Sequence, residues 1–229
     1  MNKLIAESIL KALRAEFRKF DVEEFTVLKA VQSKNPFQIL VAVVLSQNTS
    51  DKNSLKAFNN LTDKLVNITP WRIIETPLEE LEEIIKPAGI HKKRAEALRK
   101  ISMEIIRRYN GDLSRILKLP PEDIRRELMK LPQVGAKTAD VLILFLKGGY
   151  TIPIDTHLNR LSKRIGYVNS KAGYEEIRGK LMNLFKPEEY LEVHLLHILL
   201  GRKYCKAKKP KCKVCPIVGY CRYEFKVIQ

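Results

Sequence analysis

Residues 131–147 read LPQVGAKTADVLILFLK, a turn rich in proline and glycine followed by a mainly apolar run. With the helix that we expect at 122–130, this stretch predicts two helices joined by a tight hairpin at about 122–147. A helix start leaves backbone N–H groups unpaired, and together with the positive end of the helix dipole these groups can hold a phosphate. The stretch therefore favours either a hairpin that binds the DNA backbone or an ordinary connection between two helices.

Helical signals extend over the rest of the chain. Apolar residues repeat at spacings of three and four from Leu4 to Phe17, which is typical of an amphipathic helix. Residues 37–45 (FQILVAVVL) could form a buried strand, but their Asn-Pro start and the lack of a partner strand favour a helix. We expect an all-α fold, with further helices at residues 36–45, 51–66, 78–85, 92–109, 122–130, 136–147, 156–165, 174–184 and 188–200.

The chain is strongly basic, with 42 lysines and arginines against 26 acidic residues and a formal charge of +16 at pH 7. Two runs are one-sided in sign, HKKR at residues 91–94 and KAKKPK at residues 206–211. Solvated surfaces usually mix both signs, so we interpret these runs as contacts for a polyanion rather than as general solubility charge. Nucleic acid is the expected partner.

All four cysteines lie within the last 25 residues, and their spacing is C-x6-C-x2-C-x5-C. Thiolates this close together can surround one site, whereas disulfides that brace a core usually join distant segments. The spacing admits a [4Fe-4S] cluster, a zinc ion or two disulfides, although zinc sites typically use two C-x2-C pairs and only one is present. The candidate ligands are Cys205, Cys212, Cys215 and Cys221.

Lys137 and Asp155 are the candidates for chemistry. Lys137 lies in the first turn of an apolar helix, where the dipole and partial burial would favour the neutral amine, a nucleophile that can form a Schiff base with a sugar. Asp155 precedes the helix expected at 156–165, so it can cap that helix and still serve a reaction. If the chain turns back at Gly148 and Gly149, Asp155 returns to the mouth of the cleft that holds Lys137.

Three motifs in order, LPQVGAKTADV, PIDTHLNRLSKR and the cysteine spacing, resemble those of endonuclease III, a DNA glycosylase/AP lyase family of the helix-hairpin-helix superfamily. The resemblance spans nearly the whole chain and includes LSQNTSDKN (45–53) and GIHKKRAEAL (89–98), which are similar to the family's DNA-wedge loops. It implies two helical domains: a six-helix barrel at 23–149 that contains the hairpin, and an iron-sulfur domain formed by 1–22 and 150–229. It also implies a [4Fe-4S] cluster on the four cysteines.

The resemblance implies a base-excision repair enzyme that removes oxidised pyrimidines from damaged double-stranded DNA. Lys137 aligns with the family's lysine that attacks C1′ of the deoxyribose, and Asp155 aligns with the aspartate that assists it and stabilises the cationic sugar. The Schiff base then permits β-elimination and strand cleavage. Two alternatives remain: a glycosylase for uracil or thymine mismatches or other lesions on the same scaffold, and a non-catalytic cluster-containing DNA-binding protein.

The resemblance also implies DNA contacts. Either Gln47 or Asn48 fills the gap left by the flipped base, because the family's glutamine aligns with Asn48 while a glutamine stands one position earlier. The hairpin has Gln133 where the family usually has glycine, so either the turn needs no positive φ there or its geometry differs. The expected DNA-binding residues are Gln47, Asn48, Ile90, His91, Gln133, Gly135, Ala136, Lys206, Lys208, Lys209 and Lys211.

The N-terminus shows no targeting signal. Residues 1–20 carry seven charges, so they lack the apolar core of a signal peptide, and no stretch of the sequence is long enough to span a bilayer. Thiols that are clustered near one end of the chain fit a reducing compartment. We therefore expect an intracellular monomer, in the cytoplasm or nucleoid, with no membrane partner.

Overall fold

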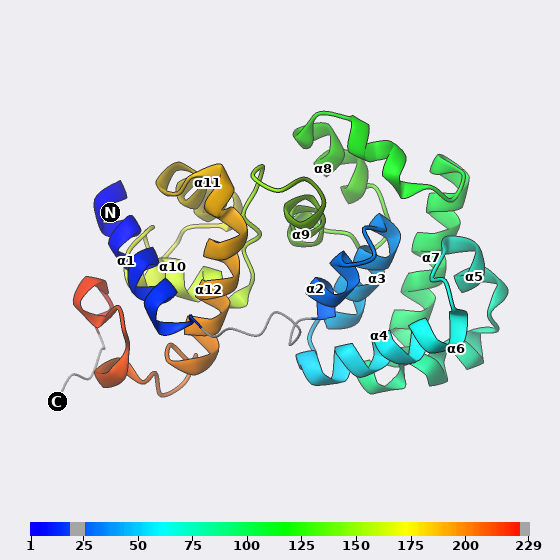
Figure 1. The fold of residues 1–229 in the computed structure, drawn as a ribbon, viewed down its shortest axis with the longest axis horizontal. Coiled ribbons are helices and arrows are strands. Elements are labelled where there is room, and N and C mark those ends of the chain that lie inside the picture. The colour runs from blue at the N-terminus through cyan, green and yellow to red at the C-terminus, as the bar shows by residue number, and fades with distance from the viewer. Residues whose placement is uncertain (19–25, 225–229) are drawn as a thin grey trace. The chain divides into compact units, whose positions relative to one another are not determined.

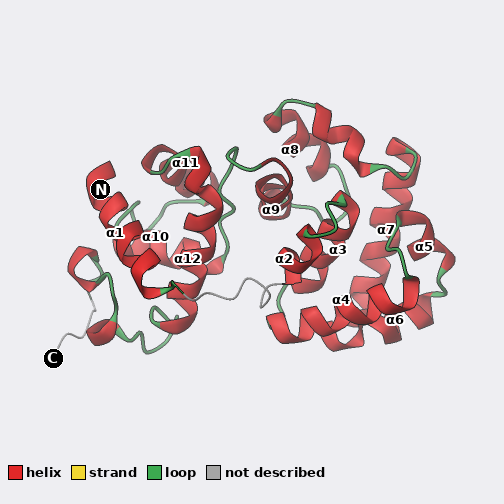
Figure 2. Cartoon of the chain, viewed as in Figure 1, coloured by secondary structure: helices red, strands yellow, loops and turns green. Residues whose placement is uncertain are grey.

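The computed structural model describes residues 1–18 and 26–224 of the chain (Figures 1 and 2). Over these two ranges the regular elements are helices, with no strand, which confirms the all-α prediction. The chain divides into two compact units, one formed by Met1–Phe20 and Lys147–Gln229 and the other by Asp21–Leu146. The domain boundary expected between residues 22 and 23 lies outside the described residues.

One central helix organises the unit formed by Asp21–Leu146. The helices of this unit are α2 (Thr26–Val31), α3 (Pro36–Ser46), α4 (Asp51–Leu65), α5 (Pro70–Glu75), α6 (Leu78–Ile85), α7 (His91–Tyr109), α8 (Pro121–Met129) and α9 (Ala136–Lys147), with short 3-10 turns at Lys86–Ala88 and Leu113–Lys118. α3 is buried along nearly its whole length and contacts α2, α4 and α7. Its apolar run therefore forms a core helix, as expected from its Asn-Pro start.

The second unit joins the two ends of the chain. It contains α1 (Lys3–Glu16), α10 (Thr156–Ile165), α11 (Tyr174–Leu184) and α12 (Tyr190–Lys203), with short 3-10 turns at Pro187–Glu189, Cys212–Val214 and Val218–Tyr220. α1 packs beside α12 (Figure 1), and the ion pair from Arg14 Nη2 to Glu192 Oε2, at 2.6 Å, links the two helices. The sequence-distant α1 and α12 thus share one core.

Side-chain caps fix several of the helix starts. Asn35 accepts a hydrogen bond from the backbone N of Phe37 at 2.9 Å, and Thr69 accepts one from the backbone N of Arg72 at 3.2 Å. Two helices, α2 and α5, do not follow from apolar periodicity, because their six residues span less than two turns.

Candidate active site

The hairpin expected at about 122–147 is formed by α8, a turn at residues 130–135 and α9. Gln133 in this turn has φ of 60°, which lies in the left-handed region that glycine adopts most readily. The turn therefore requires a positive φ at this position. The alternative that the turn needs no positive φ at Gln133 is wrong. Gln133 is exposed, and its backbone has a conformation that is strained for glutamine and would not be strained for glycine.

A buried ion pair fixes α9 against α8. Arg125 donates from Nε to Asp140 Oδ1 at 2.9 Å, and the Asp140 side chain is fully buried. Asp140 lies three residues after Lys137, so the pair sets the rotation of α9 about its own axis less than one turn from the candidate nucleophile. Removing either partner would leave a charge in the interior of the unit.

Lys137 is the second residue of α9 and its side chain is exposed. The first-turn position agrees with the sequence prediction, but the expected partial burial is wrong for the protein without DNA. The apolar residues of α9 point into the core from Ala139 onward, whereas the lysine lies on the solvent side of the first turn. Any desolvation of this amine must therefore come from bound DNA.

Gln47 and Asn48 have different environments. Gln47 ends α3, is half-buried, and its Nε2 donates to Thr138 Oγ1 at 3.4 Å. Thr138 directly follows Lys137, so the Gln47 carboxamide lies beside the helix that carries the candidate nucleophile. Asn48 is exposed and has φ of 51°, so its side chain is available to an approaching ligand.

Ile90 has a conformation that is unusual for its residue type. It precedes α7, its φ is 50°, and it is 60% exposed, although left-handed backbone is strongly disfavoured for β-branched side chains. His91 follows as the first residue of α7 and is half-buried. An exposed apolar side chain on strained backbone makes Ile90 a candidate for a functional contact, but Val66 shares both features, so the position of Ile90 beside α7 and Arg94 carries the assignment.

Arg94 connects these segments. The sequence placed it in the basic run 91–94 that we expected to contact a polyanion, and this is wrong for Arg94, which is 7% exposed and binds backbone carbonyls instead. Its Nε donates to Gly89 O at 2.8 Å, and its two terminal nitrogens donate to Val44 O and Gln47 O. Together with the bond from Gln47 to Thr138, this arrangement brings residues 47–48, 89–91 and the start of α9 into one network. A signal was present: Arg94 lies on the apolar face of α7, in helical register with Leu98 and Ile101, where a charged residue needs buried partners.

Asp155 belongs to the other compact unit and caps α10. Its Oδ1 accepts a hydrogen bond from the backbone N of Leu158 at 2.7 Å, as expected for an aspartate before a helix. The side chain is half-buried, and its second carboxylate oxygen is not needed for this cap. Capping and a role in chemistry are therefore compatible at this residue.

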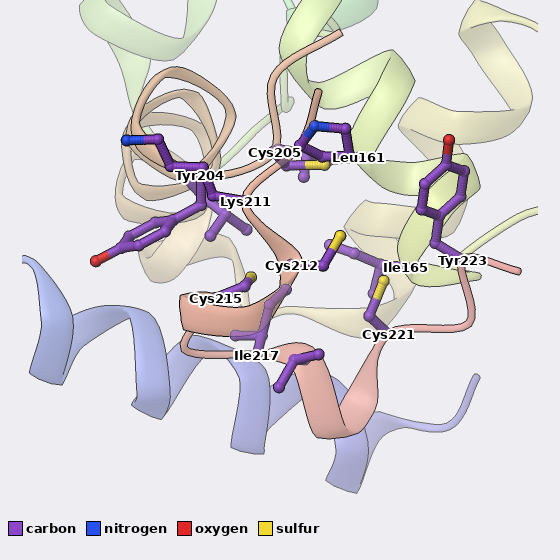
Figure 3. Close-up of a pocket in the computed structure, with 13 residues that line it drawn as sticks. Leu161, Ile165, Tyr204, Cys205, Lys211, Cys212, Cys215, Ile217, Cys221 and Tyr223 are labelled. Carbon is purple, nitrogen blue, oxygen red and sulfur yellow. The ribbon is translucent and has the colours of Figure 1, made fainter. Parts of the chain in front are cut away.

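The four cysteines line one cavity, together with apolar side chains that include Leu161, Ile165 and Ile217 (Figure 3). They carry thiols rather than disulfides, so the disulfide alternative is wrong. Burial, with a smaller contribution from the other three cysteines, raises the pKa of the Cys215 thiol to about 11. Four thiolates in one partly buried cavity would repel each other, so the site calls for a positively charged group.

Four thiols that line one cavity can bind a metal-containing group. A [4Fe-4S] cluster takes one thiolate at each of four iron corners, and a single zinc ion can also be bound by four thiolates. The candidate ligands in this cavity are Cys205, Cys212, Cys215 and Cys221.

The lysine loop between Cys205 and Cys212 is held at its base. Arg164 of α10 donates from Nη1 to Lys206 O at 2.8 Å and from Nη2 to Ala207 O at 3.0 Å. The backbone N of Lys211 donates to Tyr204 O at 2.9 Å and closes the loop. The loop exposes four lysines that can contact phosphates: Lys206, Lys208, Lys209 and Lys211.

Comparison with known proteins decides the family. The model of the HhH-GPD superfamily of base excision DNA repair proteins matches residues 41–187. The chain is 34% identical over 220 residues to endonuclease III of Sulfolobus acidocaldarius, covering 96% of each chain. It is 37% identical over 188 residues to endonuclease III of Bacillus subtilis, covering 82% of this chain and 81% of that one. The chain belongs to the endonuclease III family.

The fold of this endonuclease III homologue also matches that of solved relatives. A trapped endonuclease III–DNA covalent intermediate superposes with a TM-score of 0.80 at 34% identity, covering 97% of this chain and 96% of that chain. The chain is accordingly a DNA glycosylase and AP lyase of base excision repair, and it binds DNA. Each helix in the described ranges is too short or too polar to cross a bilayer.

We predict that the lysine loop contributes phosphate contacts. Replacing Lys208 and Lys209 with alanine should weaken duplex binding and make the slope of log K against log salt shallower by about 2, because each lost phosphate contact changes the slope by roughly 0.9. The matched control is Lys3→Ala with Lys11→Ala, which removes the same charge from exposed positions on α1. Equal slopes for the wild type and the loop variant would contradict the prediction.

Proposed function

We propose that the chain removes oxidised pyrimidines from double-stranded DNA and cleaves the strand with Lys137 as its nucleophile. The observation that carries this proposal is the position of Lys137: an exposed amine in the first turn of α9, directly after a hairpin that presents backbone N–H groups. The hairpin would hold a phosphate while the amine approaches the neighbouring sugar. The trapped covalent intermediate with DNA of a 34% identical relative supports a mechanism in which a protein nucleophile bonds to DNA.

The proposed reaction has four steps, from displacement of the base to release of the enzyme. The Lys137 amine forms a bond to C1′, and the bond from C1′ to the base breaks with its electron pair leaving on the base, which is then protonated. The sugar ring opens to give a protonated Schiff base between Nζ and C1′. Loss of a proton from C2′ expels the 3′ phosphate by β-elimination and cleaves the strand. Water then hydrolyses the Schiff base and regenerates the amine.

Asp155 would assist this nucleophile. Its cap to Leu158 uses one carboxylate oxygen, so the other can accept a proton from the Lys137 ammonium or stabilise positive charge that develops on the sugar. A carboxylate held by a helix start keeps its orientation without help from DNA. We propose this role from the residue type, the cap geometry and the resemblance of the surrounding motif.

The segments around Arg94 would open the duplex. Asn48 and Ile90 are both exposed on left-handed backbone, and we propose that they fill the space left by the flipped nucleotide. Gln47 is bonded to Thr138 beside Lys137 instead, and we propose that its carboxamide contacts the extruded base. His91, Gln133, Gly135 and Ala136 would contact the backbone around the lesion.

We propose that a [4Fe-4S] cluster is bound by Cys205, Cys212, Cys215 and Cys221. Its support is the shared cavity and the unfavourable environment of uncompensated thiolates there. When bound, the cluster would join the lysine loop to the helices beneath it and would have no part in the sugar chemistry. The lysine loop would contact phosphates through its four lysines.

We predict that borohydride traps the wild-type protein on a duplex with an oxidised pyrimidine or an abasic site. Lys137→Ala should abolish trapping and lower the cleavage rate by about a thousandfold or more, because the nucleophile itself is removed. Lys147→Ala, which removes an exposed lysine from the other end of α9, is the matched control and should trap normally.

Three outcomes would contradict this proposal. Equal trapping by Lys137→Ala would exclude Lys137 as the nucleophile. No trapping by the wild type would exclude the Schiff base. Faster processing of a uracil or thymine mismatch than of an oxidised pyrimidine would overturn the substrate assignment and favour the mismatch alternative.

Metal analysis of protein purified without oxygen tests the cluster. We expect about four iron atoms and four acid-labile sulfides per chain, with broad visible absorption that is lost when Cys215 is replaced by alanine. One zinc per chain without iron would overturn the cluster assignment, because four thiolates can also bind a single zinc ion.

A further inference from the structure

Arg94 holds the two peptide groups that lead directly into Ile90 and Asn48, both of which are exposed on left-handed backbone. It donates to Gly89 O, whose peptide group includes the nitrogen of Ile90, and to Gln47 O, whose peptide group includes the nitrogen of Asn48. Ile90 has φ of 50° and Asn48 has φ of 51°. One guanidinium therefore restrains the rotation that places both side chains.

The same side chain caps α3. The carbonyl oxygens of Val44 and Gln47 lie at the C-terminal end of that helix, where backbone acceptors lack helical partners and the dipole is negative. Arg94 is 7% exposed, and burial lowers the pKa of its guanidinium. A planar fork with five N–H groups can reach three acceptors in different segments at once, which a lysine ammonium cannot do with the same geometry.

The network continues to the candidate nucleophile's helix. Gln47 is bonded to Arg94 through its carbonyl and to Thr138 through its carboxamide. Thr138 is adjacent to Lys137. The backbone that carries Asn48 is thus tied on one side to the start of α7 and on the other to the start of α9.

We propose that Arg94 is a positioning residue for base extrusion, which sets Asn48 and Ile90 in their gap-filling conformations before DNA binds. This inference rests on the proposed function, because it assigns a step that precedes attack by Lys137. Arg94 itself touches neither DNA nor the sugar. Because both side chains are set in advance, binding energy is not spent on ordering them when the base leaves the stack.

The test compares Arg94→Lys with the wild type on two duplexes under single turnover. One duplex carries 2-aminopurine beside an oxidised pyrimidine, and its fluorescence rises when the lesion leaves the stack; the other carries an abasic site, which has no base to extrude. We expect the extrusion and base-removal rates to fall by about tenfold or more, and abasic cleavage to fall by less than about threefold, since misplaced positioning groups can cost up to a hundredfold.

The control is Arg99→Lys on the same helix. Arg99 donates from Nη1 to Thr76 O at 3.0 Å. This variant therefore also alters an arginine of α7 that binds a backbone carbonyl. Its carbonyl partner belongs to neither of the two segments that carry Asn48 and Ile90. Arg99→Lys should leave both rates within about twofold of the wild type, because substitutions away from the core usually have small effects on stability. Both substitutions preserve net charge, so long-range attraction to DNA is unchanged.

A double-mutant cycle separates positioning from loss of folding. In a background with Asn48→Ala and Ile90→Ala, Arg94→Lys should lower the extrusion rate by less than about twofold further, because the side chains that it positions are gone. Equal losses by Arg94→Lys on both duplexes, or a full additional loss in the alanine background, would overturn the inference. Normal base removal and trapping by the wild type on the oxidised-pyrimidine duplex, together with trapping at the abasic site, would show that the proposed function itself stands in either case.

Discussion

The buried ion pair between Arg125 and Asp140 determines what α9 can present to a ligand. Asp140 is fully buried and is bonded to Arg125 at 2.9 Å, which restrains the rotation of α9 against α8. In that rotation the apolar side chains from Ala139 onward enter the core, and Lys137 is left exposed at the first turn. An electrostatic constraint in the core thus helps to set the position of the proposed nucleophile, since a single buried charge would be strongly destabilising.

The site divides its tasks among segments with different physical properties. The first turn of α9 carries the candidate amine, while residues 47–48 and 89–91 carry Asn48 and Ile90 on left-handed backbone beside a buried arginine. The cysteine cavity and its lysine loop belong to the other unit. In the proposed function a helix carries the chemistry, and strained or exposed loops contact the duplex.

Sequence patterns predicted the parts of the structure that depend on local rules. The bounds of α9, α10 and α11 agree with the predicted ranges, because apolar periodicity and capping residues such as Asp155 act within one or two turns. The six-residue helix α2 lacked such a period. The role of Arg94 could not be read in the same way, because its acceptors lie up to 50 positions away and belong to the backbone, which any residue supplies.

Two site expectations depended on the environment rather than on the residue type. Lys137 was expected to be partly buried, but the solvent side of a first turn exposes it until DNA is bound. Gln133 left two possibilities open, and its φ of 60° shows that the hairpin keeps the left-handed turn even without glycine. The exposure of Lys137 and the backbone conformation of Gln133 both depend on how the hairpin packs in the folded unit, which local sequence patterns do not determine.

Peptide mapping of the borohydride-trapped complex tests the central claim most directly. After digestion of the DNA and the protein, the sugar-derived mass should be found on Lys137, and cleavage by trypsin after this residue should be blocked. A mass addition on another lysine or on the N-terminal amine, with Lys137 unmodified, would contradict the account.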